Sequence, residues 1–155
     1  MTIRDAVEED IPELLRLLSQ VLEVHAAIKP DYFVSGHQKY NTDELKAILK
    51  DESVRVYVAA EGKEILGYTF CMINELPKKP FIAHFKYMYI DDLCVDERYR
   101  GKDIAKALFE HVKKEAKVLG CREITLNVWE GNDRARAFYD KMGMTPQKTY
   151  MELKI

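Results

Sequence analysis

Apolar side chains recur in the first part of the chain with the three- and four-residue spacing of an α-helix. The residues that carry this pattern are Ile11, Leu14, Leu15, Leu18, Val21 and Leu22. The spacing predicts a helix with one buried face that extends to about residue 26. Asp10 and Glu13 have the spacing of a capping box at its start. A second capping signal at Asn41 predicts a short helix to about Lys50.

Runs of β-branched and aromatic residues then predict strands. In chain order, the predicted strands are residues 2–6, 54–60, 65–73, 82–95, 123–129 and 147–154. Helical spacing returns over residues 104–119 and 132–141, which end at Gly120 and Gly143 respectively. Two early helices, an antiparallel meander and a closing βαβ unit predict a mixed α/β domain that spans residues 1–155.

Composition places the chain among ordinary globular proteins, with 47% apolar and 32% charged residues. A formal net charge of −2 argues against nucleic-acid binding by the whole surface. We expect no membrane partner, because no apolar run approaches the length of about 20 residues that spans a bilayer. Cys71, Cys94 and Cys121 lack metal-type spacing, which predicts reduced thiols in the cytoplasm and no metal site.

One stretch combines the features of an anion-binding site. It reads Val95-Asp96-Glu97-Arg98-Tyr99-Arg100-Gly101-Lys102-Asp103-Ile104-Ala105. An apolar segment passes through a basic, glycine-containing turn into a helix, so backbone N–H groups and the positive end of the helix dipole meet at one place. Such a place suits a diphosphate. A charged helix-start loop without any ligand is the alternative interpretation.

The order of elements and two motifs resemble the GCN5-related N-acetyltransferase (GNAT) family over essentially the whole chain. The family loop Arg/Gln-x-x-Gly-x-Gly/Ala, which wraps the diphosphate of acetyl-coenzyme A, corresponds to Arg98–Asp103, with Asp103 as a departure from the pattern. The second signature is formed by Asn132, Ala135, Phe138-Tyr139 and Gly143-Met144. The resemblance implies a mixed, mostly antiparallel central sheet flanked by about four helices.

The resemblance also implies acetyl-CoA as co-substrate. Leu93, Cys94 and Val95 would pair with the pantetheine arm, and Gly101 to Lys106 would hold the diphosphate, with Arg98 or Arg100 adding charge. The full set of implied coenzyme-binding residues is Leu93, Cys94, Val95, Arg98, Arg100, Gly101, Lys102, Asp103, Ile104, Ala105, Lys106, Asn132 and Tyr139. Asn132 is equally well explained as a helix cap.

Three residues are candidates for catalysis. Tyr139 matches the family's general acid, and a phenol with a pKa near 10 stays protonated at neutral pH. The alternative is that Tyr139 is a core residue. Asp91 and Asp92 stand together in a strand whose neighbouring side chains should face opposite sides. Their tract is similar to that of diamine acetyltransferases, which implies Asp91 as base and Asp92 as a structural carboxylate, although both could be structural.

The acceptor wall is the least defined part of the predicted site. The residues that could contact the acceptor are His25, Asp31, Tyr32, Phe33 and Trp129. His25 could instead be a solvated or capping histidine, and Trp129 could belong to the core.

These features together predict direct acetyl transfer to a primary amine, with a small diamine or polyamine favoured by the acidic pair. An amino-acid, aminoglycoside or protein amine is an alternative acceptor. In another class, the chain could be an acetyl-CoA-binding sensor or interaction module with little catalysis. The absence of a Walker loop and of a Gly-x-Gly-x-x-Gly turn disfavours a general nucleotide-binding domain. The resemblance is also compatible with a homodimer that pairs through terminal strands.

Overall fold

One sheet organises residues 1–155, all of which the computed structural model describes. Its strands lie in the order β1 (Thr2–Asp5), β2 (Val54–Glu61), β3 (Glu64–Glu75), β4 (Lys86–Val95) and β5 (Glu123–Leu126). The first three pairings are antiparallel, whereas β4 and β5 run parallel. The helices are α1 (Ile11–Ile28), α2 (Thr42–Lys50), α3 (Ile104–Val118) and α4 (Asp133–Lys141). The predicted mixed, mostly antiparallel sheet with four helices is therefore confirmed.

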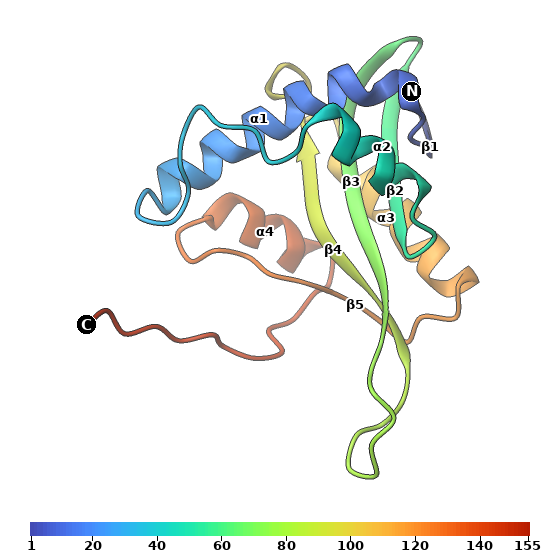
Figure 1. Cartoon of the computed structure of the whole chain (residues 1–155), viewed down its shortest axis with the longest axis vertical. Helices are drawn as coiled ribbons and strands as arrows, with labels where there is room; N and C mark the ends of the chain where they lie inside the picture. The colour runs from blue at the N-terminus through green and yellow to red at the C-terminus, as the bar shows by residue number, and fades with distance from the viewer.

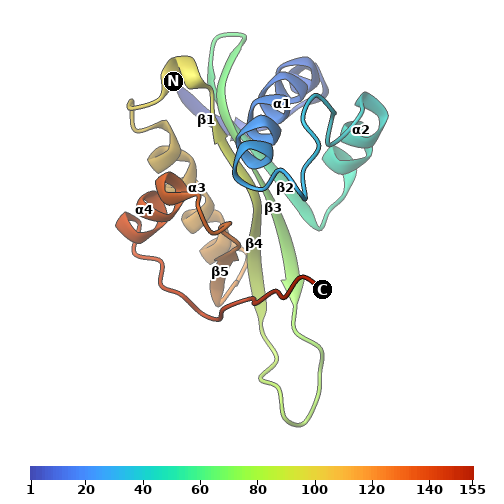
Figure 2. The same cartoon turned by 90° about the vertical axis from the view of Figure 1, so that its left-hand side faces the viewer.

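The helices cover both faces of the sheet (Figures 1 and 2). Figure 2 shows α1 and α2 on one side and α3 and α4 on the other. One core lies between the sheet and the α1 side, where Leu14, Leu17 and Tyr68 are fully buried. A second core lies on the α3 side around Met88 and Leu108. The sheet thus places the ends of its strands between two layers of helices.

Side-chain caps form at the starts of two of the four α-helices, α2 and α4. The Asn41 side chain accepts a hydrogen bond from the amide of Glu44 at 2.8 Å, and Asn132 accepts one from Ala135 at 3.2 Å. The predicted cap at Asp10 is wrong. Asp10 makes no side-chain cap to α1, because its carboxylate instead binds the Arg4 guanidinium at 2.7 Å. The ion pair with Arg4 has thus replaced the hydrogen bond that Asp10 would make to an amide of α1.

Two predicted strand boundaries and one predicted strand also need correction. Strand β4 begins at Lys86 rather than at residue 82, and β5 ends at Leu126 rather than at residue 129. The predicted strand at 147–154 is absent, since residues 145–155 form no regular structure. A strand needs a neighbour for its backbone hydrogen bonds, and this extended tail has none within the chain. No helix of the structure has the length and apolar character needed to cross a membrane.

Gly67 controls how closely β3 approaches β4. A Cβ at this position would lie 2.7 Å from the carbonyl oxygen of Cys94. Since backbone cannot yield as a flexible side chain does, we expect Gly67→Ala to lower the free energy of unfolding by about 2 kcal/mol. Urea unfolding measures this change. A stability equal to that of the unmodified chain would show that β4 is not held at this distance.

Candidate active site

An irregularity in β4 brings the two adjacent aspartates to one place. Phe70 of β3 pairs with Asp92, and the next residue, Cys71, pairs with Ile90, so Asp91 is the extra residue of a β-bulge. The bulge changes which face the following side chains occupy. Ile90 packs in the α3-side core, whereas Cys94, four residues later, packs in the α1-side core. The expectation that neighbouring aspartates face opposite sides is therefore wrong.

Both carboxylates bind the same primary ammonium. Lys39 Nζ, from the loop between α1 and α2, donates to Asp91 Oδ2 at 2.9 Å and to Asp92 Oδ2 at 2.8 Å. Burial raises the pKa of Asp92 despite the lysine beside it. Burial opposes the charge of Lys39 too, but the two carboxylates outweigh it and hold the lysine pKa above its ordinary value. The pair is thus a built site for a primary ammonium.

Tyr139 projects from α4 into the same region. Its ring lies 6.2 Å from that of Phe109 and 5.1 Å from that of Phe138. Its hydroxyl has no hydrogen-bond partner in the chain, and its pKa is raised, first by burial and then by the charge of Asp92. A raised pKa keeps the phenol protonated at neutral pH, as a proton donor requires.

Four of the five predicted acceptor residues form one aromatic cluster, and His25 joins this cluster to the acidic pair through the charge of Asp92. The ring of Phe33 lies 5.2 Å from His25 and 5.4 Å from Trp129, and Tyr32 lies 5.1 Å from Trp129. His25 is half-buried, and burial lowers its pKa while Asp92 and Lys39 act on it with opposite signs. These rings form an apolar wall that joins the end of α1 to the loop after β5.

Asp31, the fifth predicted acceptor residue, is engaged elsewhere. Its carboxylate pairs with Lys29 at 3.6 Å and with Lys154 of the C-terminal tail. Lys29 in turn binds Glu152 at 2.7 Å. Asp31 therefore holds the tail beside the end of α1, and two lysines already pair with its carboxylate.

The turn between β4 and α3 offers a series of free backbone donors. The amides of residues 100–106 donate to no carbonyl and no side chain of the protein. Gly101 has a φ of +80°, and Asp103, the N-cap of α3, has a φ of +57°. Aspartate is one of the few non-glycine residues that tolerate this left-handed region, so it preserves the turn where the family pattern has Gly or Ala. The run of amides at the start of a helix fits a diphosphate.

The two arginines of this turn have different surroundings. Arg98 is held by the fully buried Asp96, with its Nη2 atom 2.8 Å from Oδ2, and by Glu64 at 3.2 Å. Arg100 is exposed and forms no ion pair. Of the two arginines predicted to attract an anion, only Arg100 has an unpaired guanidinium. The guanidinium of Arg98 instead stabilises the turn through its ion pairs.

The edge of β4 next to this turn is open. Pairing between β4 and β5 stops at Ile90 and Leu126, so Leu93 to Val95 pair only with β3. Cys94 is buried, and burial raises the pKa of its thiol to about 12. A thiol that stays protonated is a poor nucleophile. An open strand edge beside free amides matches the extended arm and the diphosphate of coenzyme A.

Comparison with known proteins agrees with this geometry. Residues 21–144 match the model of the acetyltransferase (GNAT) family. The chain belongs to the GNAT acetyltransferase family. It is 25% identical to the thialysine N-epsilon-acetyltransferase of Bos taurus, over 91% of this chain and 82% of that protein. It is 28% identical to the spermine/spermidine N(1)-acetyltransferase of Bacillus subtilis, over 73% of this chain and 76% of that protein.

A solved structure covers this acetyltransferase from end to end. It is a mutant of the BH1408 protein from Bacillus halodurans, with 36% identity and a TM-score of 0.95 over 100% of this chain and 99% of that one. Family membership makes the chain an acetyl-CoA-dependent acyltransferase. No group of three or more His, Cys, Asp or Glu side chains is arranged to hold a metal ion.

Two residues of the candidate site carry no signal in the sequence. Lys39 stands in an irregular loop and has no motif or periodicity that links it to Asp91, 52 residues later. Tyr68 is fully buried, and its hydroxyl has no hydrogen-bond partner. Burial, followed by the charge of Asp92, raises the pKa of this phenol. In the sequence, a tyrosine within a predicted strand looks like any other core residue. No sequence pattern therefore distinguishes Tyr68 from the neighbouring core residues.

The ion pairs of Asp96 stabilise the turn that carries the free amides. Asp96 Oδ2 also binds Arg16 of α1 at 2.7 Å. We expect Asp96→Asn to lower the free energy of unfolding by about 2 kcal/mol at pH 7, less than for a wholly buried pair because both arginines keep solvent contact. The two arginines and an amide hold the pKa of Asp96 far below its usual range. Its contribution is therefore present above pH 4 and declines as the pH falls below about 4, the unfolded value.

Urea unfolding of both forms at pH 7 and at pH 3.5 tests this prediction. The difference between them should shrink at the lower pH. Asp140→Asn, which breaks an exposed pair with Arg136, is the matched control and should change stability by less than about 0.5 kcal/mol. An equal difference at both pH values would show that the charge of Asp96 does not stabilise the fold.

Proposed function

We propose that this acetyltransferase acetylates a primary amine of a small cationic molecule, with diamines and polyamines as the favoured class. One observation carries the proposal. Asp91 and Asp92 bind a primary ammonium, that of Lys39, at 2.9 and 2.8 Å. An amine with a pKa near 10 reaches the protein as a cation, so paired carboxylates attract it before they help to deprotonate it.

Each residue of the site then has a stated role. Asp92, whose pKa is raised by burial, accepts a proton from the bound ammonium, while the more exposed Asp91 holds it. This assignment reverses the one favoured by sequence. The freed amine forms an N–C bond as the thioester C–S bond breaks, and Tyr139 gives its proton to the leaving sulfur. The new amide nitrogen then loses its second proton, which passes through solvent and restores the neutral phenol of Tyr139. Acetyl-CoA supplies the activated acetyl group. Neither Cys71 nor Cys94 carries it in this proposal, because burial raises the pKa of both thiols to about 12.

The coenzyme would be held mainly by backbone. The free amides of residues 100–106 and the exposed Arg100 would bind the diphosphate, and the open edge of Leu93–Val95 would pair with the pantetheine arm. The Asn132 side chain already caps α4, so its predicted contact with the arm would use the remaining donors of its amide. The three free thiols favour a reducing compartment, and we propose the cytoplasm as the location.

A thiol-release assay over a panel of amines tests the proposed acceptor class. The panel holds 1,4-diaminobutane, spermidine, lysine, an aminoglycoside and an amino sugar phosphate. We expect kcat/KM for 1,4-diaminobutane or spermidine to exceed that for the amino sugar phosphate at least about tenfold, equivalent to 1.4 kcal/mol of transition-state binding. Faster release with the amino sugar phosphate would reject a cationic acceptor. Coenzyme binding without release on any amine would instead favour a sensor.

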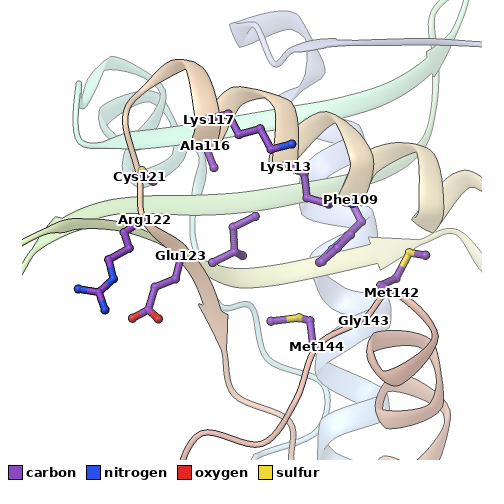
Figure 3. Close-up of a pocket in the computed structure, with 11 residues that line it drawn as sticks. Phe109, Lys113, Ala116, Lys117, Cys121, Arg122, Glu123, Met142, Gly143 and Met144 are labelled. Carbon is purple, nitrogen blue, oxygen red and sulfur yellow. The ribbon is translucent and has the colours of Figure 1, made fainter.

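We also propose that two copies pair through the C-terminal tail, which extends away from α4 (Figure 1) and is held to its own chain by the ion pairs of Glu152 and Lys154. Apolar and polar residues alternate along it, as in a strand, yet Met151 and Leu153 are more than 80% exposed. The outer edge of β5 has no partner strand. Beside it lies a hollow of about 240 Å³ between α3 and β5, toward which Phe109 and Met144 project (Figure 3). A tail from a second copy would satisfy the open edge and cover these side chains.

Charged substitutions in the tail test the dimer. We expect Met151→Glu combined with Leu153→Glu to weaken the dimer about a hundredfold, since each buries a charge in place of an apolar side chain. Light scattering coupled to size exclusion measures the mass at several concentrations. Lys148→Glu, on the other face of the tail, is the control. A chain that is monomeric at 100 µM without any substitution contradicts the proposal.

A further inference from the structure

The side chain at the acidic pair belongs to the protein itself. Lys39 carries a primary ammonium on an unbranched four-carbon stem, which is the chemistry of a bound alkyl amine. Its Nζ atom uses the Oδ2 atoms of both Asp91 and Asp92. A second ammonium cannot bind these oxygens in the same way while Lys39 holds them. The occupant and the proposed acceptor therefore compete for one place.

The position of Lys39 allows its side chain to move away from the two aspartates. Its side chain is 36% exposed, whereas that of Asp92 is only 6% exposed, so the lysine covers the buried carboxylate from the solvent side. The backbone of residues 37–40 neither donates nor accepts any hydrogen bond. The loop is tied down before this segment, where Gly36 and Ser35 bind Glu23, and after it, where Asn41 caps α2. Moving Lys39 therefore breaks its ion pairs without breaking backbone bonds.

The surrounding charges favour replacement of the Lys39 ammonium by another ammonium over departure of Lys39 with nothing in its place. Two carboxylates and one ammonium leave the group one charge negative, and His25 beside them is kept neutral because burial lowers its pKa. Removing Lys39 without a replacement would leave the buried Asp92 unpaired, which is costly. An incoming ammonium restores the pairing. Exchange of one primary ammonium for another is therefore the low-cost route into the site.

We propose that Lys39 is a tethered occupant of the acceptor subsite, which a primary alkylammonium must displace before acetyl transfer. This inference rests on the proposed function and deepens it, since it names the group that the acceptor resembles and the residue that sets its apparent affinity. Occupancy by Lys39 reduces apparent affinity by the fraction of molecules in which the subsite is filled. Lys39 thus lowers the apparent affinity of every incoming cation by the same factor, so a weakly binding cation fills the subsite only at high concentration.

Calorimetric titration of 1,4-diaminobutane in the presence of coenzyme A, at pH 8, tests the proposal. We expect Lys39→Gln to bind the diamine about tenfold more tightly than the unmodified chain. Lys39→Arg keeps a tethered cation and should stay within twofold. Lys46→Gln, the same change on exposed α2 without contact to the pair, should also stay within twofold. Equal or weaker binding by Lys39→Gln would overturn the proposal.

A second measurement on the unmodified chain does not depend on the folding of a variant. Trace acetic anhydride labels lysines, and peptide mass spectrometry compares Lys39 with Lys46. We expect Lys39 to react several-fold more slowly than Lys46, and the ratio of the Lys39 rate to the Lys46 rate to rise when 1,4-diaminobutane is added. The ratio corrects for the anhydride that the diamine consumes, because that loss affects both lysines equally. A rate ratio that the diamine leaves unchanged would overturn the proposal.

The thiol-release assay on the same variants separates this inference from the proposed function. Tighter diamine binding by Lys39→Gln with no thiol release on any amine would support the tethered occupant and reject amine acetylation. Thiol release with equal diamine affinity in both forms would support amine acetylation and reject the tethered occupant.

Discussion

Replacing Asp92 by asparagine is expected to lower kcat/KM for the acceptor amine by about a thousandfold, within the range for loss of a general base. The amide keeps the shape of the side chain but can neither accept the proton nor balance the ammonium. The buried position of Asp92 makes this loss large, because water cannot easily replace a carboxylate that is 6% exposed. Steady-state kinetics with acetyl-CoA and 1,4-diaminobutane measure the effect.

Coenzyme affinity provides the internal control for this variant. The amides of residues 100–106 do not contact Asp92, so KM for acetyl-CoA should stay within about twofold. Asp43→Asn, on the exposed first turn of α2, is the matched substitution and should leave both constants unchanged. A loss in kcat/KM of less than tenfold would remove Asp92 from proton transfer and leave Asp91 as the alternative base.

Replacing Tyr139 by phenylalanine is expected to lower kcat by about a hundredfold, the lower part of the range for a general acid. The ring stays packed against Phe109 and Phe138, so the fold should be unaffected. The hydroxyl has no hydrogen-bond partner in the chain, so its removal orphans no protein group. KM for acetyl-CoA should remain unchanged.

The control for this variant is Tyr150→Phe, which removes a hydroxyl from a 99% exposed ring in the tail. Solvent viscosity effects establish that chemistry, and not product release, limits the rate. Equal kcat in the Tyr139→Phe variant and the unmodified chain, under chemistry-limited conditions, would exclude the phenol as proton donor.

Local signals in the sequence predicted the helices well. The caps at Asn41 and Asn132 satisfy amides three residues away, so the relevant bonds lie within one turn. The cap at Asp10 was wrong because Arg4, on a strand, competes for the carboxylate. The strand at 147–154 was wrong because alternation indicates only the capacity to pair. The tail instead lies by the end of α1, where Lys29 and Asp31 pair with Glu152 and Lys154, and it pairs with no strand.

The sequence predicted those parts of the candidate site that belong to a recognisable motif. The turn around Gly101 and the position of Tyr139 follow from sequence patterns and the family resemblance. The bulge at Asp91 does not, since a single extra residue in a strand leaves no periodic signal. Lys39 was also hidden, because only the packing of the loop before α2 against β4 brings its ammonium to the aspartates.

The central claim is that free amides around Gly101 hold the diphosphate of the coenzyme and that the bulged aspartates hold the acceptor amine. A crystal structure with coenzyme A and 1,4-diaminobutane tests both parts at once. The account predicts the diphosphate on the amides of residues 100–106, the sulfur beside Tyr139, and an amine nitrogen in hydrogen-bond distance of Asp91 and Asp92, with Lys39 displaced. A diphosphate bound away from this turn, or an amine bound away from the aspartates, would contradict it.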